Sequence, residues 1–222
     1  RGGAERPRGR PALELRRAHP RGRRVIGGLV LAAGAGTRFG SAKQLAVLHG
    51  RPLLEYALRT MAAAPLDRVL VMLGSEAEEV MRGVDLHGAE PVVCDRWEEG
   101  QAASLACGLA ELNDCEAVVV TLGDQPGLSP EAITRVLAAR GDFDAVRATY
   151  AGEPGYPVLL ERRLFGRLRD VSGDHGARHL LLSVPTAGVP CDDLGGPHDV
   201  DTQDQLAALR AGAVSPPPDS RS

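Results

Sequence analysis

Short apolar runs rich in β-branched residues alternate with longer segments of helical periodicity from residue 25 onward. The runs are apolar throughout, which is typical of strands that are covered on both faces of a parallel sheet. We therefore expect a three-layer α/β/α sandwich with a Rossmann-like, mainly parallel sheet, in which ligands bind at the carboxyl ends of the strands. The expected strands are residues 25–31, 68–73, 90–94, 117–122, 144–150 and 156–160.

Seven segments of helical periodicity lie between or after these strands. Pro52 and Pro130 suit the first position of a helix, and Ser129 is placed to cap the helix that begins at Pro130. The expected helices are residues 52–64, 76–83, 101–112, 130–140, 161–168, 176–183 and 203–211.

A length of 222 residues favours one domain, which we place at residues 25–211. Residues 1–24 hold nine of the 26 basic residues and two of the 29 acidic ones, and we expect them to form a disordered basic arm. The proline-rich segment 212–222 is expected to be a disordered tail. Without the arm the net charge is about −10, which argues against a nucleic acid as the main partner.

The four cysteines, at positions 94, 107, 115 and 191, form no CxxC pair and do not combine with histidines at zinc-finger spacing. We expect reduced, mostly buried thiols. The sequence shows no signal-peptide pattern and no apolar run of membrane-spanning length. These features predict a cytoplasmic protein with no membrane partner.

The stretch LVLAAGAGTRFGSAKQ at residues 29–44 places three glycines directly after the first expected strand. Glycines let the backbone turn tightly and present its amides to an anion, so the loop is predicted to bind phosphate. It is not a dinucleotide fingerprint, because Phe39 stands where the third glycine is needed. It is not a Walker loop either, because Gln44 follows Lys43.

Arg38 and Lys43 are the cations of this loop, and Lys43 is the only lysine in the chain. A guanidinium binds phosphate oxygens with a planar fork, whereas an ammonium is a compact point charge on a flexible stem. We expect Arg38 to hold phosphate and Lys43 to lie where charge moves during a reaction.

The pattern G-x-G-x-R-x-G-x-x-K resembles the LAAGxGxRxGxxK signature of the MobA-like NTP transferases, and the match is closest to the molybdenum cofactor cytidylyltransferases. The resemblance implies a fold of the nucleotide-diphospho-sugar transferase type. It also implies that Arg38 and Lys43 are catalytic and stabilise the pentacoordinate phosphorus and the departing pyrophosphate. The nucleotide-binding residues that it implies in this loop are Leu31, Ala32, Ala33, Gly34, Gly36, Thr37 and Gly40.

Two aspartates are candidate metal ligands. Asp124, in GDQP, ends an apolar strand at the edge of the sheet that should also hold the glycine-rich loop. Asp201, in HDVDT, could supply a second carboxylate, as magnesium prefers one or two carboxylates with phosphate oxygens and water. Both segments resemble the family, which implies Mg²⁺ at Asp124 and Asp201 with Asp199 behind them. The alternatives are a strand-end turn for Asp124 and a helix N-cap for Asp201.

Three further segments resemble substrate-binding parts of the family. WEEGQAASLACGL (97–109) resembles the segment beside the base and ribose, with Gly100 and Ser104 as binding residues, although an ordinary helix cap explains them equally well. GEPGYP (152–157) and SGDHGARHLL (172–181) resemble the acceptor side, with tyrosine at position 156 where the family usually has histidine. The acceptor-binding residues implied are Gly155, Tyr156, Pro157, Asp174 and Arg178.

The function that the resemblance implies is transfer of CMP from CTP onto the phosphate of a molybdopterin-type cofactor, with release of pyrophosphate. The implied partners are CTP, a small phosphorylated acceptor such as molybdopterin, and a molybdoenzyme or its chaperone. Three alternatives stay open at this point. They are a nucleotidyltransferase that uses GTP or another acceptor, an NAD(P)-dependent oxidoreductase that uses the same cleft, and a nucleotide-sensing module without catalysis.

Overall fold

The computed structural model describes residues 25–169, 181–194, 196 and 198–212, and its centre is a seven-stranded sheet of order β5-β4-β1-β6-β8-β7-β9. All of its strands run parallel except β8, which is antiparallel to β6 and β7. The mainly parallel sheet is therefore confirmed. The strands are β1 (Ile26–Leu31), β4 (Arg68–Leu73), β5 (Glu90–Val93), β6 (Ala117–Leu122), β7 (Ala145–Tyr150), β8 (Glu153–Glu161) and β9 (Thr186–Pro190).

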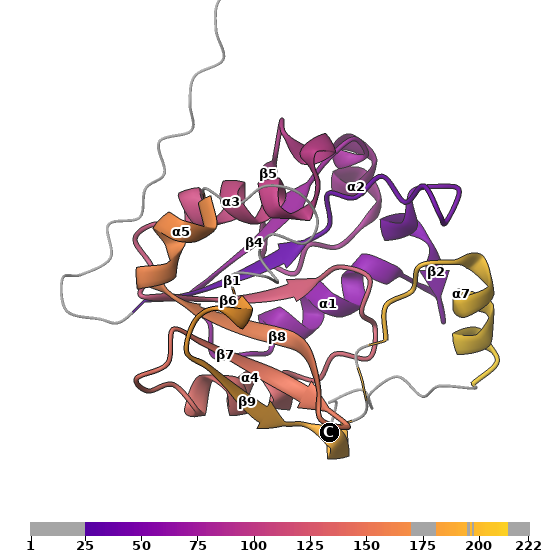
Figure 1. Ribbon diagram of the computed structural model, residues 1–222. Helices are drawn as coiled ribbons and strands as arrows, with labels where there is room; N and C mark the ends of the chain where they lie inside the picture. The colour runs from indigo at the N-terminus through magenta and orange to yellow at the C-terminus, as the bar shows by residue number, and fades with distance from the viewer. Residues whose placement is uncertain (1–24, 170–180, 195, 197, 213–222) are drawn as a thin grey trace, which may run out of the picture.

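Helices cover both faces of this sheet (Figure 1). One face packs against α1 (Leu53–Ala62), α2 (Ala77–Gly83) and α4 (Pro130–Ala138), and the other against α3 (Gln101–Glu111) and α5 (Phe165–Arg169). Successive strand residues serve opposite faces, so that Leu29 lies in one core and Val30 in the other. Two covered faces explain the continuously apolar strands and confirm the three layers. None of the described helices has the length and apolar character needed to cross a bilayer.

Four single-turn helices and one small hairpin lie between these elements. They are η1 (Lys43–Leu45), η2 (Trp97–Glu99), η3 (Arg162–Leu164), η4 (Asp192–Leu194) and the antiparallel pair β2 (Val47–Leu48) and β3 (Arg51–Pro52).

The expected elements differ from the structure at the β7–β8–β9 edge. Ala151 and Gly152 both have positive φ and join β7 to β8 in a two-residue hairpin, which makes β8 antiparallel. Strand β9 was not predicted, because TAGVP is a partly exposed edge strand with little apolar content. The expected helix 176–183 lies mostly outside the described residues.

A small third core holds the C-terminal helix α7 (Gln203–Arg210) against the glycine-rich loop. Phe39 from the loop is only 4% exposed and packs in one cluster with Leu48, Val200 and Leu206. Because Val200 and Leu206 flank the start of α7, this packing brings residue 201 to the loop. Apolar contact thus joins segments that are far apart in the sequence.

The structure corrects the expectation of four reduced thiols. Cys94, at the end of β5, is bonded to Cys107 of α3, and their Cα atoms lie 6.1 Å apart. Spacing rules could not show this pair, because it depends on α3 packing beside the β5 end. Cys115 and Cys191 are free and buried, as expected.

Candidate active site

The site forms where three segments meet at the carboxyl edge of the sheet. Strands β1 and β6 are neighbours with Leu31 beside Leu122, so the glycine-rich loop and Asp124 leave the sheet side by side. The backbone N–H of Val200 donates to the Asp124 carbonyl oxygen at 3.0 Å, which adds the segment before α7. The arrangement follows the rule that parallel α/β sheets bind ligands at this edge.

Four charged side chains form a cluster at this meeting point. Lys43 Nζ lies 2.5 Å from Asp124 Oδ2 and 3.2 Å from Asp201 Oδ1. Arg38 Nη1 lies 3.2 Å from Asp201 Oδ2. The Lys43 side chain is 15% exposed and the Arg38 side chain is 76% exposed. Lys43 is therefore held between two carboxylates, whereas Arg38 contacts one of them from an exposed position that a ligand can also reach.

The protonation of Lys43 follows from its surroundings. Burial by itself would lower the pKa of Lys43, but the charges and hydrogen bonds of Asp124 and Asp201 outweigh it and raise the pKa above the ordinary value. The lysine is therefore a cation at neutral pH.

Asp201 is not the N-cap of α7, so that alternative is wrong. Thr202 is the cap, and its hydroxyl accepts from the Gln205 backbone N–H in a capping box. The Gln205 side chain also accepts from the backbone N–H of Asp201 at 2.6 Å. The backbone of Asp201 is thus held by the cap while its carboxylate faces Lys43 and Arg38.

The carboxylate pair suits a hard divalent cation. Asp124 Oδ1 is buried and has no hydrogen-bond partner among the described atoms, while Oδ2 accepts from Lys43. No group of three or more His, Cys, Asp or Glu side chains in the described parts of the chain could hold a metal alone. Two carboxylates that rely on phosphate oxygens and water for the remaining positions are the donor set that Mg²⁺ prefers. The residues therefore fit the metal only together with a phosphate ligand.

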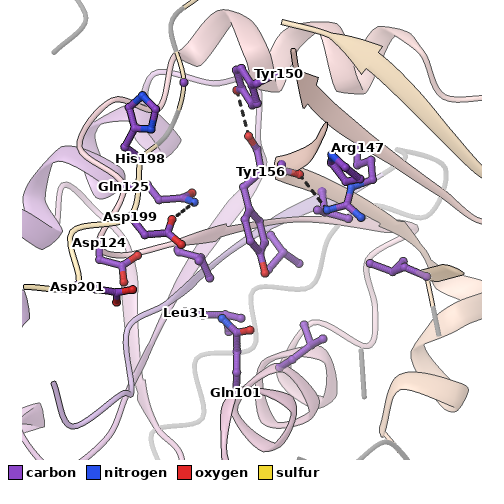
Figure 2. A pocket seen from close by; sticks show the side chains of 18 of the residues that line it. Leu31, Gln101, Asp124, Gln125, Arg147, Tyr150, Tyr156, His198, Asp199 and Asp201 are labelled. Atoms are coloured by element: carbon purple, nitrogen blue, oxygen red, sulfur yellow. Dashed lines mark hydrogen bonds between the residues drawn. The ribbon is translucent and has the colours of Figure 1, made fainter. Parts of the chain in front are cut away.

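Two glutamines support the site and were missed in the sequence. Gln44 is 7% exposed, and its Nε2 donates to the carbonyl oxygens of Ala32 at 2.7 Å and Gly34 at 2.9 Å. Gln125 Nε2 donates to Asp199 Oδ1 at 2.7 Å (Figure 2). The only available signal was a polar residue directly after Lys43 and directly after Asp124.

The Asp199 carboxyl lies behind the metal candidates. Desolvation raises its pKa first, and the nearby charges of Asp124 and Asp201 raise it further, while the bond from Gln125 acts in the opposite direction. Figure 2 shows Asp199, Asp124 and Asp201 along one side of a pocket.

A cavity of about 560 Å³ lies over the glycine-rich loop. Every nucleotide-binding and catalytic candidate lines it except Gly40. Trp97, Gln101 and Gln44 line it in addition. The candidates that line it are Leu31, Ala32, Ala33, Gly34, Gly36, Thr37, Arg38, Lys43, Gly100 and Ser104.

A second cavity of about 750 Å³ lies beside the first, toward β8 and β7. Of the acceptor candidates, Gly155 and Tyr156 line it and Pro157 does not, while Asp174 and Arg178 lie outside the described residues. The residues that line both cavities are Leu31, Arg38, Lys43, Gln101, Leu122, Asp124 and Asp201. The charged cluster is therefore the wall that the two cavities share.

Gly34 lines the smaller cavity, and nothing in the fold of the protein requires a glycine at this position. A Cβ at this position would meet no protein atom within 4 Å, and its φ lies outside the left-handed region. We expect Gly34→Ala to melt at the parent temperature but to bind a triphosphate about 10- to 100-fold more weakly, because the methyl group would occupy ligand space.

The matched control is Gly141→Ala, another exposed glycine with open space, which lies outside both cavities. Isothermal titration calorimetry and a melting curve measure the two quantities. Unchanged binding by Gly34→Ala would show that no ligand approaches this position.

A family model described as "MobA-like NTP transferase domain" matches residues 28–187. "Nicotine blue oxidoreductase" of Paenarthrobacter nicotinovorans is 32% identical over 195 residues, which cover 83% of this chain and 96% of that protein. "Purine catabolism protein PucB" of Bacillus subtilis (strain 168) is 31% identical over 196 residues, which cover 82% and 95%. The solved structure of Rv0371C in complex with manganese, from Mycobacterium tuberculosis H37Rv, has a TM-score of 0.74 and 32% identity over 84% of this chain and 98% of that one.

Proposed function

The chain belongs to the MobA-like NTP transferase family, and from this premise we propose that it transfers CMP from CTP to the phosphate of a molybdopterin-type cofactor and releases pyrophosphate. The observation that supports the proposal best is the pair of cavities with Lys43, Asp124 and Asp201 in their common wall. Two substrates bound on either side of one charged cluster have their reacting groups in contact with it.

In the proposed reaction, a phosphate oxygen of the acceptor attacks the α-phosphorus of CTP in line. The bond from the α-phosphorus to the oxygen that bridges to the β-phosphorus breaks, and pyrophosphate leaves with the electron pair. The transfer needs no covalent enzyme intermediate, so the chain contributes positioning and charge stabilisation.

The roles of the residues follow from their exposure and their partners. Arg38 extends from the loop and would bind the outer phosphates with its planar fork. Lys43 would stabilise the charge on the transferring phosphoryl group. A divalent cation held by Asp124 and Asp201 would supply charge neutralisation of the triphosphate. The manganese complex of the related mycobacterial protein supports this metal assignment.

The preference for CTP rests on the resemblance of Leu31–Gly34 to the LAAG sequence of cytidylyltransferases, in contrast to the LAGG common in guanylyltransferases. Ala32 and Ala33 both line the smaller cavity and are at most 8% exposed. A transferase that uses GTP or a different acceptor would keep the same charged cluster.

An NAD(P)-dependent oxidoreductase is the second candidate, because a relative with 32% identity is named an oxidoreductase. The loop argues against a dinucleotide. Phe39 stands where the third glycine of the fingerprint is needed, and it is 4% exposed in the core with α7. The site therefore favours a metal–triphosphate complex.

A thermal-shift screen of CTP, GTP, ATP and NADPH, each with magnesium or EDTA, tests the proposal. A ligand at 100 times its dissociation constant stabilises by about 2.7 kcal/mol, which raises the melting temperature of a domain of this size by roughly 5–10 °C. We expect the largest shift with CTP and magnesium and little shift with EDTA. A CTP shift that EDTA leaves unchanged contradicts the metal site, and a larger shift with NADPH favours the oxidoreductase.

A further inference from the structure

Arg147 lies in the middle of β7 and lines the larger cavity. Its neighbours Val146 and Ala148 are at most 1% exposed and face the core with α4. Arg147 therefore faces the opposite side of the sheet, where it pairs with Val158, which is 3% exposed. A buried charge is costly unless it is paired, and Arg147 interacts with other groups of the protein while it also lines the cavity.

The backbone of β8 is irregular opposite this arginine, whereas β7 keeps an unbroken register with β9. The register between β7 and β8 shifts after Arg147, because Gly155, Tyr156 and Pro157 of β8 stand opposite the single residue Ala148. Such bulges redirect the side chains of the bulged strand, often beside active sites. Arg147 Nη2 lies 3.5 Å from the Gly155 carbonyl oxygen. Figure 2 shows the side chains of Arg147 and Tyr156 both pointing into the pocket. A guanidinium has five N–H donors in one plane, so it can contact protein and ligand at the same time.

The two ends of this cavity differ in charge. Figure 2 shows Asp124, Asp199 and Asp201 at one end and Arg147 at the other, toward β7. Lys43 is at the first end, because it is paired with Asp124 and Asp201. The walls between the two ends are apolar and come from the sheet on one side and α3 on the other. They include Val120, Leu122, Val158, Ala102 and Leu105. A space between a sheet face and a helix favours a flat ligand body.

Tyr156 adds a polar group along this space. Burial raises the pKa of its phenol to about 12, although the charge of Arg147 acts in the opposite direction. The hydroxyl is therefore neutral at physiological pH and can both donate and accept a hydrogen bond. Arg147, in contrast, can only donate, so a hydrogen bond from it to a ligand needs an acceptor atom on that ligand.

We propose that Arg147 selects the acceptor substrate by donating to a carbonyl or carboxylate oxygen of a planar heterocycle, at the end remote from the reacting phosphate. The inference rests on the proposed function, because it takes the acceptor phosphate to lie beside Lys43. Arg147 is a specificity-determining residue and takes no part in the bond changes.

Binding of pterin-6-carboxylate, a planar and fluorescent heterocycle, tests the inference by fluorescence titration. We expect Arg147→Met to weaken its binding about 10- to 100-fold, since a charge-assisted hydrogen bond is lost. Arg147→Lys should fall between this variant and the parent, because it keeps the charge but loses the fork. The matched control is Arg82→Met, an exposed arginine on α2 outside both cavities.

Two results would overturn the inference. One is parent-like pterin binding by Arg147→Met, or by Arg147→Lys if the methionine variant does not fold. The other is that the parent binds glucose 1-phosphate, which is not planar, as tightly as it binds pterin-6-carboxylate.

The stabilisation by CTP and magnesium is expected to be the same in the parent and Arg147→Met. Its absence from the parent would count against the proposed function alone, so the two failures are distinguishable.

Discussion

Lys43→Ala is expected to lower the single-turnover rate of CMP transfer by about two to four orders of magnitude, with a far smaller change in affinity for CTP and magnesium. The reason is that the ammonium group lies in the wall shared by the two cavities, where charge develops as the α-phosphorus is attacked. Lys43→Arg should also be impaired. The Nζ atom lies 2.5 Å and 3.2 Å from two carboxylates, and a guanidinium keeps the charge but differs from this compact ammonium in shape and reach.

The affinity for a divalent metal shows whether Lys43→Ala is slow because it lacks the ammonium group or because its metal site is damaged. Without Lys43, Asp124 and Asp201 lose the cation that they share, and only Asp201 keeps a second one, Arg38. We therefore expect Lys43→Ala to bind Mn²⁺, measured by calorimetry without nucleotide, at least as tightly as the parent. Weaker Mn²⁺ binding would show that the lysine supports the metal site. A Lys43→Arg variant as fast as the parent would show that any cation serves at this position.

Asp124→Asn is expected to lower the same rate by about two to three orders of magnitude at low magnesium, because it removes the charge of a proposed metal ligand and keeps its shape. Raising the magnesium concentration should recover part of the rate, whereas it should not restore Lys43→Ala. Single-turnover transfer at several magnesium concentrations measures the difference.

Asp204→Asn is the matched control for Asp124→Asn. Asp204 is an exposed carboxylate in the first turn of α7, and it lines neither cavity. Its rate should stay close to that of the parent at every magnesium concentration. A defect in Asp124→Asn that is independent of magnesium would contradict the metal-ligand role.

Features that depend on neighbouring residues could be predicted from the sequence. Apolar runs and helical periodicity predicted the layers, because the period of each element reports the faces that it buries. The cap at Ser129 was predicted from the same local chemistry, and its hydroxyl accepts from the Glu131 backbone N–H. Asp124 was expected beside the glycine-rich loop because parallel strands end at the same edge.

Features that depend on contacts between distant segments could not be predicted from the sequence and are set by the folded chain. Asp201 meets Lys43 because Phe39 packs against α7, a contact between residues that no local pattern joins. Thr202 rather than Asp201 caps that helix, and the one-residue difference leaves the carboxylate directed at the lysine. Arg147 lies on a cavity wall because Val146 and Ala148 beside it pack into the core with α4, which leaves Arg147 on the opposite face of the sheet. The direction of a side chain is set by strand pairing and packing, and these exist only once the whole chain has folded.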